Sequence, residues 1–421
     1  MTAEKALEFI HKKLWQGSKP GLSRTRELLR LMGQPQDSLS FVHVAGTNGK
    51  GSTAAMLASV LRCAGYKTGL YTSPFVSCFN ERMQVNGEQI SDEELAEITS
   101  LCAPLAESMP DSPTEFELVT AIAFEFFKRR GCDAVVLEVG MGGRLDSTNV
   151  IASPLCSVIT NIGLDHTREL GDTAEKIAAE KAGIIKPNCP TVIYDLPQSV
   201  RQVIAEKCEE QGSKLTAADF SKICPVSDGL DGQVFTYKSS DALRLPLLGA
   251  HQLKNAAVVL ETIAVLRQGG LAISNEAVSQ GFLLAHWPAR FEIIAEKPYF
   301  VVDGGHNPQC AETVAGSLNK YFPGEKKVVL FGVLADKDYM GLALQLNRAA
   351  DEFVTITPPS PRALDASALA ERLAVFKKPV TACGSIAEGI EAARARAGGS
   401  GVVCSVGSLY SAGTVRKYFG K

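Results

Sequence analysis

The chain has 421 residues, of which 45% are hydrophobic, and a formal net charge of −3. Because one hydrophobic core rarely extends over so many residues, we expect two domains. The interspersed charges argue against nucleic acid or an anionic membrane as the main partner, and no apolar stretch approaches the ~20 residues that span a bilayer.

Short β-branched runs alternate with longer amphipathic segments in the first half of the chain, a pattern typical of parallel strands covered by helices. The predicted strands are Phe41–Val44, Gly69–Thr72, Ala134–Val139, Leu155–Asn161 and Thr191–Tyr194. The predicted helices are Ser52–Ala64, Ser91–Ala106, Glu115–Arg130 and Thr173–Ile184. Residues 215–245 are turn-rich, follow neither period and receive no assignment.

A second alternating series begins near Tyr299. Its predicted strands are Tyr299–Asp303, Lys327–Phe331, Phe353–Thr357, Pro379–Ala382 and Val402–Val406. Because Glu296–Pro298 has the composition of a linker, we expect an N-terminal domain of residues 1–295 and a smaller domain of residues 299–421. The predicted fold class is α/β, with a P-loop ATPase-type parallel sheet followed by a smaller Rossmann-like α/β domain.

The eleven cysteines form no C-x-x-C pair, and most of them stand in apolar stretches. This distribution is typical of buried, reduced thiols and argues against a zinc or disulfide framework. We therefore expect a cytoplasmic protein.

The segment Gly46–Ser52 predicts a phosphate-binding loop. It follows the buried strand Phe41–Val44 and precedes a helix, which is the context that such a loop requires. Glycines let successive backbone N–H groups turn toward phosphate oxygens, the helix N-terminus adds partial positive charge, and Lys50 reaches the outer phosphates. The alternative is an ordinary glycine-rich turn, which the lysine in this context disfavours.

The loop departs from the general pattern G-x-x-x-x-G-K-S/T in two places. Val44 holds the position of the first glycine, and Gly51 stands where a hydroxyl residue normally follows the lysine. A magnesium-binding hydroxyl must therefore come from Ser52 or from elsewhere in the fold.

Polar side chains end or follow three other predicted strands, at the edge of the sheet where open α/β folds bind ligands. These are Ser73, Glu138 and His166. Magnesium prefers oxygen ligands, and imidazole is an unusual one. Taken singly, Ser73 suits a turn, Glu138 a surface acid and His166 a loop. Their shared edge favours a site, most clearly for Glu138.

Several spaced segments together resemble the folylpolyglutamate synthase and dihydrofolate synthase family of the Mur ligase superfamily. They are Gly46–Ser52, Tyr71–Pro74, Phe79–Arg82, Glu138–Asp146, Leu164–Thr167, Ala179–Ile184, Pro288–Glu292, Asp303–Pro308 and Ser408–Gly413. The resemblance implies a Mur-ligase-like ATP-binding domain and a C-terminal glutamate-ligase domain. The implied activity is ADP-forming addition of L-glutamate to a reduced folate through an acyl phosphate, and the motifs leave open a second activity that converts dihydropteroate to dihydrofolate.

The resemblance also implies residue roles. Ser73, Glu138 and His166 are implied to bind magnesium. Lys181 is implied to bind a second metal as a carbamate, although its spacing alone predicts only an ordinary helix lysine. The implied ATP contacts are Asn48, Gly49, Lys50, Gly51, Ser52, Asn255, Arg290 and Asp303. The implied catalytic residues are Lys50, Lys181 and His306. The implied contacts of the pteridine-bearing substrate are Gly21, Leu22, Ser23, Arg24, Thr114, Glu115, Phe116, Leu145 and Ser147.

Two positions differ from the common pattern of the family. Phe75 replaces the histidine that often follows Ser-Pro, and Gly305 replaces an alanine. We expect Phe75 to alter the folate-side loop and Gly305 to be benign. Phe116 suits stacking on an aromatic ring, although a core phenylalanine is the commoner interpretation.

Three other functions are weighed against this prediction. A dedicated dihydrofolate synthase would use the same motifs. A cell-wall Mur ligase usually carries threonine where Gly51 stands. A nucleotide-dependent switch would need an N-K-x-D sequence, of which Asp336–Asp338 is only a superficial echo. The expected partners are a reduced folate or dihydropteroate and L-glutamate, with no nucleic acid or membrane, and we expect a monomer.

Overall fold

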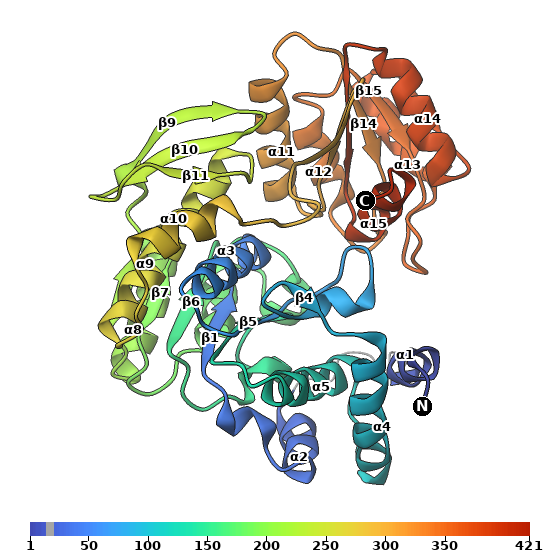
Figure 1. Cartoon of the computed structure of the whole chain (residues 1–421). Helices are drawn as coiled ribbons and strands as arrows, with labels where there is room; N and C mark the ends of the chain where they lie inside the picture. Colours follow the sequence, from blue (N-terminus) through green and yellow to red (C-terminus); the bar gives the residue numbers. More distant parts are fainter. Residues whose placement is uncertain (14–20) are drawn as a thin grey trace.

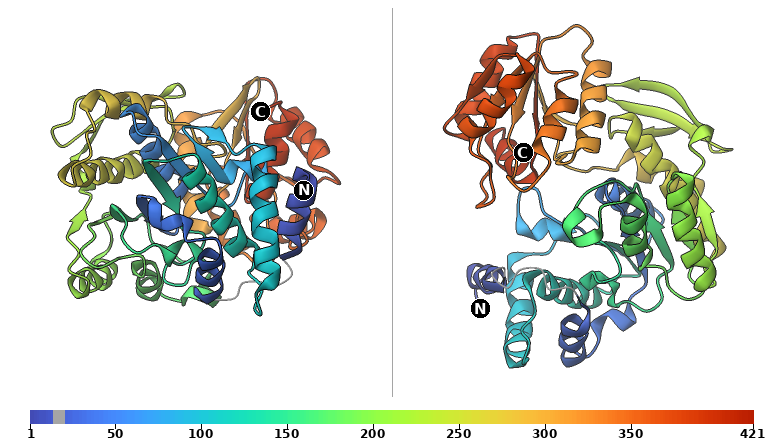
Figure 2. Two further views of the ribbon diagram at one scale, coloured as in Figure 1. Left: turned by 60° about the horizontal axis from the view of Figure 1, so that its bottom comes forward. Right: turned by 180° about the vertical axis from the view of Figure 1, so that it is seen from behind.

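A computed structural model describes residues 1–13 and 21–421, and its ribbon separates into two α/β domains of unequal size (Figure 1). Each domain has its own central sheet with helices packed against it, and a third, smaller sheet lies beside both domains (Figures 1 and 2). Among the described helices, none is long and apolar enough to cross a membrane. The predicted α/β class with two domains is confirmed.

The larger domain contains an eight-stranded sheet. Its strands are β1 (Phe41–Ala45), β2 (Thr68–Tyr71), β3 (Met83–Val85), β4 (Glu88–Gln89), β5 (Ala134–Glu138), β6 (Cys156–Ile159), β7 (Thr191–Ile193) and β8 (Leu215–Ala217). Their order is β4-β3-β2-β5-β1-β6-β7-β8. The six strands from β2 to β8 in this order run parallel, so their carboxyl ends meet at one edge.

Ten helices of the described residues belong to this domain. They are α1 (Ala3–Lys12), α2 (Ser23–Leu31), α3 (Lys50–Cys63), α4 (Asp92–Ser108), α5 (Glu115–Arg129), α6 (Thr167–Leu170), α7 (Ala174–Ala182), α8 (Gln198–Glu210), α9 (Ala250–Gln268) and α10 (Asn275–Leu283). Short 3₁₀ helices are η2 (Pro35–Ser38), η3 (Phe79–Arg82), η4 (Ser147–Val150) and η5 (Phe220–Lys222). The predicted strands and helices are confirmed with small shifts at their ends.

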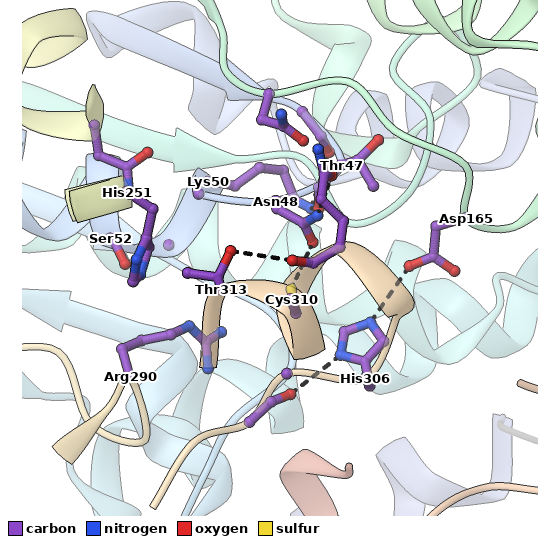
Figure 3. Close-up of a pocket in the computed structure, with 18 of the residues that line it drawn as sticks. Thr47, Asn48, Lys50, Ser52, Asp165, His251, Arg290, His306, Cys310 and Thr313 are labelled. Carbon is purple, nitrogen blue, oxygen red and sulfur yellow. Dashed lines mark hydrogen bonds and ion pairs between the residues drawn. The ribbon is translucent and has the colours of Figure 1, made fainter. Parts of the chain in front are cut away.

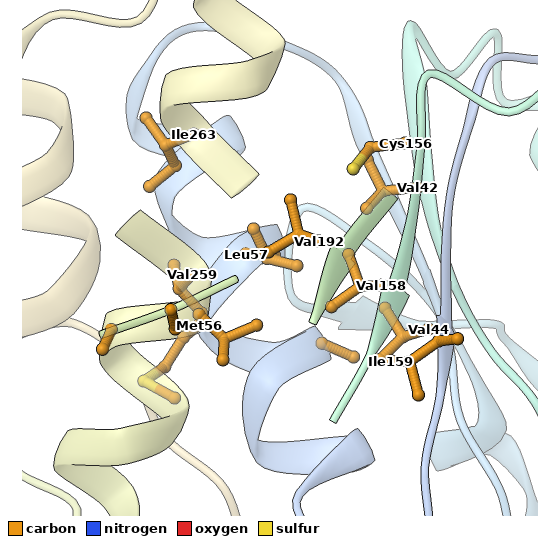
Figure 4. Close-up of a cluster of buried hydrophobic side chains, with 14 of the residues drawn as sticks. Val42, Val44, Met56, Leu57, Cys156, Val158, Ile159, Val192, Val259 and Ile263 are labelled. Carbon is orange, nitrogen blue, oxygen red and sulfur yellow. The ribbon is translucent and has the colours of Figure 1, made fainter. Parts of the chain in front are cut away.

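The phosphate loop is held by a dry core beneath it. Helices α3 and α9 pack against each other and against the sheet, and side chains such as Val44, Met56, Val158 and Val259 fill the layer between them (Figure 4). Strands β1, β5 and β6 are buried along their whole length, because other elements cover both faces of the sheet. Their largely apolar sequences are typical of parallel strands in this position. A rigid strand and helix therefore flank the loop.

The unassigned residues 215–245 contain a three-stranded antiparallel sheet after β8. Its strands are β9 (Ile223–Gly229), β10 (Gly232–Tyr237) and β11 (Leu243–Leu245). Most of β9 is exposed, so it lacks the alternation of buried and exposed residues that marks a strand in sequence. Its Asp228 forms an ion pair with Lys320 and accepts a hydrogen bond from the Tyr321 hydroxyl at 2.6 Å. The small sheet thus contacts the C-terminal domain.

The smaller domain contains a six-stranded sheet. Its strands are β12 (Glu292–Glu296), β13 (Tyr299–Val302), β14 (Lys327–Phe331), β15 (Glu352–Thr355), β16 (Val380–Ala382) and β17 (Val402–Val406), in the order β12-β13-β17-β14-β15-β16. Its helices are α11 (Pro308–Tyr321), α12 (Tyr339–Leu346), α13 (Ala366–Leu373), α14 (Ile386–Ala397), α15 (Leu409–Tyr418) and the 3₁₀ helix η6 (Ala374–Phe376). All strands are parallel except β12.

The prediction that Glu296–Pro298 links the two domains is wrong. Strand β12 pairs antiparallel with β13, so Glu296 ends a strand and Lys297–Pro298 forms the turn of a hairpin inside the smaller domain. The lysine–proline pair marks a tight turn here, not a passage between domains. The domain boundary expected after residue 295 therefore lies before β12.

Candidate active site

A cavity of about 610 Å³ lies between the two domains, where β1, β2, β5 and β6 end (Figure 3). It is lined by every residue predicted for nucleotide, metal or catalysis: Asn48, Gly49, Lys50, Gly51, Ser52, Ser73, Glu138, His166, Lys181, Asn255, Arg290, Asp303 and His306. Arg290 and His306 lie across the cavity from the loop residues Asn48 and Lys50 (Figure 3).

Two glycines of the phosphate loop have a positive φ and no room for a side chain. Gly46 has a φ of 154°, and a Cβ there would lie 1.8 Å from Thr160 Oγ1. Thr160 Oγ1 in turn donates to the carbonyl oxygen of Asn48 at 2.8 Å. A Cβ on Gly49, with a φ of 87°, would lie 2.6 Å from Asn255 Oδ1. The loop is therefore fixed from below by Thr160 and Asn255.

Gly51 owes its place to Trp287. A Cβ at this position would lie 2.8 Å from the indole ring, so the serine or threonine of the general pattern would not fit. Lys50 Nζ donates to the carbonyl oxygens of Gly46 and Thr47 at 3.1 and 3.3 Å and thus folds back over its own loop.

Ser73, Glu138 and His166 lie on the cavity wall beside the loop. Glu138 accepts a hydrogen bond from the Ser73 N–H at 3.1 Å, and burial raises the pKa of its carboxyl while Lys50 opposes that shift. Ser73 Oγ is buried and has no hydrogen-bond partner among the described residues. Burial and the Lys337 ammonium lower the pKa of His166. No three His, Cys, Asp or Glu side chains of the described residues form a metal cluster, so a metal here would depend on the Ser73 hydroxyl.

Lys181 is a buried cation beneath the phosphate loop. Lys181 is only 3% exposed, and its Nζ donates a hydrogen bond to the Gly46 carbonyl oxygen at 2.9 Å. Burial, with a smaller contribution from Lys50, lowers the pKa of Lys181 to about 7. Within residues 1–13 and 21–421 no carboxylate forms an ion pair with it.

The smaller domain supplies the opposite wall through Arg290, Asp303 and His306. Asp303 accepts hydrogen bonds from the N–H groups of Phe291 and Gly305 at 2.8 and 2.7 Å, which fixes the two turns together. Burial raises the pKa of Asp303, and the nearby Arg290 guanidinium opposes the shift.

A polar cluster across the cavity was missed by the sequence prediction. Asp165 lies 2.7 Å from Lys337 Nζ and 3.5 Å from His306 Nε2. Burial by itself would raise the pKa of Asp165. The contacts with His306 and then Lys337 outweigh burial and hold that pKa well below its usual range. Asp165 stands next to His166 after β6, within the family segment Leu164–Thr167, but only His166 received a role in the sequence prediction. Lys337 lies in the segment Asp336–Asp338, whose sequence was compared only with a guanine-reading sequence. That comparison gave no indication that Lys337 pairs with Asp165.

Asn48 of the phosphate loop also contacts the smaller domain directly. Its amide donates to Gln309 Oε1 at 2.8 Å and accepts from Asn307 Nδ2 at 2.9 Å. The Cys310 thiol lies 3.1 Å from Asn48 Oδ1. A Cβ on Gly305 would lie 2.8 Å from Cys310 Cβ, so the glycine at this position leaves room for the cysteine.

The far end of the cavity is lined by Tyr194, Asp195, Phe220 and His251. Asn255 is 1% exposed, and its amide already bonds within the protein, to the Tyr194 hydroxyl and to Gln252 Oε1. Tyr194 and Asp195 follow β7, so the same strand-end rule would have predicted them.

The residues predicted for the pteridine-bearing substrate lie outside the lining of this cavity. They gather where α2, α5 and η4 begin, and these elements pack against one another. Gly140, on the cavity wall, connects the two regions, because a Cβ there would lie 2.5 Å from Phe116 Cζ. Leu145 is 38% exposed and Phe116 is half-buried.

Arg24 is engaged inside the protein. Its guanidinium donates to both carboxylate oxygens of Glu117 at 3.0 and 2.9 Å and to Asp111 at 3.1 Å. Glu117 also accepts from the Thr114 N–H at 2.7 Å, as part of the capping box that starts α5.

The loop residue Phe75 packs near another aromatic side chain: the centroid of its ring lies 6.2 Å from that of the Phe79 ring.

Family models match both domains. The "Mur ligase middle domain" matches residues 44–263, and the "Mur ligase, glutamate ligase domain" matches residues 289–409. The fold and the site therefore define a Mur ligase. The chain is 36% identical over 423 residues to the dihydrofolate synthase/folylpolyglutamate synthase of Bacillus subtilis (strain 168), with 98% of each chain covered. The protein belongs to the folylpolyglutamate synthase and dihydrofolate synthase family, as its motifs predicted.

Solved structures agree over the whole chain. Mycobacterium tuberculosis folylpolyglutamate synthase complexed with ADP has a TM-score of 0.90 and 30% identity, covering 100% of this chain and 99% of that one. The E. coli FolC structure in complex with DHPP and ADP has a TM-score of 0.87 and 29% identity, covering 100% of this chain and 98% of that one.

Proposed function

We propose that the protein is an ADP-forming amide ligase that uses ATP to add L-glutamate to a reduced folate. The observation that carries the proposal is the interdomain cavity, in which Lys50 of the phosphate loop faces Arg290 and His306 (Figure 3). Two similar enzymes whose structures contain ADP, one of them with DHPP as well, support a nucleotide and a pteridine-type substrate.

In this proposal the chain's own groups bind ATP from both domains. The N–H groups of the phosphate loop and Lys50 bind the phosphates, and Asn255, Arg290 and Asp303 contact the nucleotide. Transfer of the terminal phosphoryl group to the substrate carboxylate gives an acyl phosphate and ADP. The amine of glutamate attacks the acyl carbon, the bond to the phosphate oxygen breaks, and the amide forms with release of inorganic phosphate and a proton. His306 stands beside the reacting groups.

Magnesium fits the residues beside the loop. The buried Ser73 hydroxyl lacks a partner among the described residues, and the buried Glu138 carboxylate receives the Ser73 N–H. These two oxygens and the neutral imidazole of His166 would hold the ion. When bound, magnesium would offset negative charge on the transferring phosphoryl group.

A second magnesium would be held by Lys181 as a carbamate. A carbamate forms from a neutral amine and carbon dioxide, and a pKa of about 7 leaves much of Lys181 neutral at neutral pH. No carboxylate of the described residues forms an ion pair with Lys181, which supports this proposal, because the modification would turn a poorly compensated buried cation into an anion that a metal can neutralise.

Water must be kept away from the acyl phosphate. The ion pairs of Asp165 with His306 and Lys337, together with the hydrogen bonds of Asn48, hold the two walls of the cavity together. These contacts support a closed state in which the smaller domain covers the reacting groups.

The folate side is proposed at the starts of α2, α5 and η4. Phe116 would stack on the pteridine, and Gly21, Leu22, Ser23, Thr114, Glu115, Leu145 and Ser147 would surround it. Arg24 would act through Glu117, because that ion pair holds the start of α5.

Measuring ADP release with ATP and glutamate tests the proposal. The assay compares tetrahydrofolate, dihydropteroate, a nucleotide-linked muropeptide and no acceptor. We expect release with tetrahydrofolate. Release with dihydropteroate as well would make the enzyme bifunctional, in line with the name of its Bacillus subtilis relative. Release with dihydropteroate alone would identify a dedicated dihydrofolate synthase, and release with neither pteridine would refute the proposal.

A further inference from the structure

The loop Ser73–Cys78 reaches from the larger domain to the C-terminal helix α15. It extends upward to α15 in two views of the ribbon, where its light blue trace meets the red helix (Figures 1 and 2). On its own domain the loop is held by Glu81, whose carboxylate accepts from the N–H groups of Val76 and Ser77 at 2.8 and 3.1 Å. The loop that carries the Ser73 hydroxyl, which has no partner in the described part of the chain, therefore also forms a domain contact.

Helix α15 covers this loop through Gly413 and Arg416. A Cβ on Gly413 would lie 1.9 Å from the carbonyl oxygen of Val76, so only a glycine lets the helix approach so closely. Arg416 is 8% exposed, and its Nη1 donates to Ser77 Oγ at 2.7 Å. The contact between α15 and the loop is thus both close and directional.

The other side of the same guanidinium faces the turn that carries Arg290. Arg416 donates from Nε and Nη2 to Glu292 at 2.9 and 3.3 Å, and Glu292 also accepts from the Ala289 N–H at 2.9 Å. Ala289 and Phe291, on either side of Arg290, have φ values of 54° and 47° in the sparsely populated left-handed region. Such a turn needs support from the surrounding structure to keep its shape.

We propose that Arg416 is a positioning residue that sets Ser73 and Arg290 relative to each other across the domain boundary. A planar guanidinium bonded to both segments transmits a displacement of one to the other. The domain closure that brings Arg290 to the phosphates therefore also brings the Ser73 hydroxyl into place. The inference rests on the proposed function, since it assigns importance to Ser73 and Arg290 through phosphate and magnesium binding.

Ser77→Ala tests the loop side of this contact and leaves the Arg416–Glu292 pair in place. We expect kcat to fall about tenfold to 100-fold, because a misplacement of about 1 Å near a reacting centre can lower a rate by about 100-fold. The KM for ATP should hardly change, while the magnesium concentration for half-maximal activity should rise. Arg416→Lys should behave like Ser77→Ala, because one ammonium cannot reproduce the two-sided fork.

Lys417→Met is the matched control, because Lys417 is the exposed next residue on α15. It removes one positive charge from the same helix turn and should keep the wild-type kcat and magnesium dependence. Magnesium dependence in Ser77→Ala equal to that of the control would overturn the proposal.

Hydrogen–deuterium exchange without metal or nucleotide gives a second readout. In Ser77→Ala and Arg416→Lys, exchange should rise in peptides covering residues 73–78 and 288–292 and stay unchanged in the phosphate loop. A rise throughout the chain, or none in these peptides, would overturn the proposal. If the wild-type enzyme releases no ADP with any acceptor, the proposed function fails, whereas the exchange pattern still decides whether Arg416 couples the two segments.

Discussion

Two buried cations of the larger domain, Arg24 and Lys181, have opposite electrostatic surroundings. Arg24 donates to Glu117 and Asp111, and the hydrogen bond with Glu117 contributes most to raising its pKa. Lys181 donates to the carbonyl oxygen of Gly46, and burial lowers its pKa to about 7. Arg24, on α2, pairs with Glu117 at the start of α5, on the proposed folate side, whereas Lys181 lines the interdomain cavity.

The difference separates architecture from chemistry. A buried charge with a good partner holds two elements together, and removing one member leaves the other uncompensated. A buried charge without a partner is unfavourable unless it becomes neutral or a ligand completes it, and such groups cluster at functional sites. Substitution of Arg24 on the proposed folate side should therefore reduce stability, and substitutions around the phosphate loop should reduce turnover with the fold intact.

The largest expected effect is that of Lys50→Ala on turnover. A cation that stabilises a transferring phosphoryl group contributes roughly 10³- to 10⁵-fold to the rate, and we expect a loss of that order in kcat for ADP release. The melting temperature should stay near that of the wild type, because Lys50 bonds only to carbonyl oxygens of its own loop among the described residues. Exposed Lys176→Ala serves as the control. Near-normal glutamate addition by Lys50→Ala would contradict the assignment of the loop.

Arg24→Met should have the next largest effect, on stability. Removing one member of a buried ion pair typically lowers the free energy of unfolding by about 3–5 kcal/mol, because Glu117 would remain buried without its partner. Urea denaturation measures the change. Arg30→Met is the matched control on the same helix, because Arg30 pairs with Glu27 on the surface and its loss should hardly shift the midpoint. Equal midpoints for the two variants would show that Arg24 contributes no more than a surface pair.

Residues near the phosphate loop could be predicted because parallel strands end at one edge. That rule and the family motifs together led to Ser73, Glu138 and His166, and all three line the cavity. Applied to the residue before His166 and to the end of β7, the rule would also have included Asp165 and Asp195.

Other features depend on contacts that no sequence spacing records. The fit of Gly51 against Trp287 joins residues distant in the chain, and so does the Asp165–Lys337 ion pair. Strand β9 was missed because its exposed residues show no alternation, and the boundary was misplaced because a hairpin turn has the composition of a linker. Local sequence patterns predict helices and strands, whereas contacts between distant segments can be identified only in the three-dimensional structure.

The smallest expected effect is a dependence on bicarbonate that varies with pH. Burial lowers the pKa of Lys181 from 10.5 to about 7, so the amine is neutral above pH 7 and protonated below it. At constant carbon dioxide pressure, the neutral fraction available for carbamylation should rise by about tenfold from pH 6 to pH 8. Enzyme in carbon dioxide-free buffer should regain activity on adding bicarbonate, more completely at pH 8 than at pH 6.

A carbamate signal in the ¹³C spectrum after addition of labelled bicarbonate should follow the same pH dependence and be absent in Lys181→Met. The unmodified lysine also has a sign that stability can report. The folded chain binds fewer protons than the unfolded chain between pH 7 and 10.5, so in carbon dioxide-free buffer stability should rise with pH across that window. Lys181→Met should flatten that rise. Activity independent of bicarbonate, with no carbamate signal, would leave Lys181 as a neutral amine and would reduce its contrast with Arg24 to one of charge state alone.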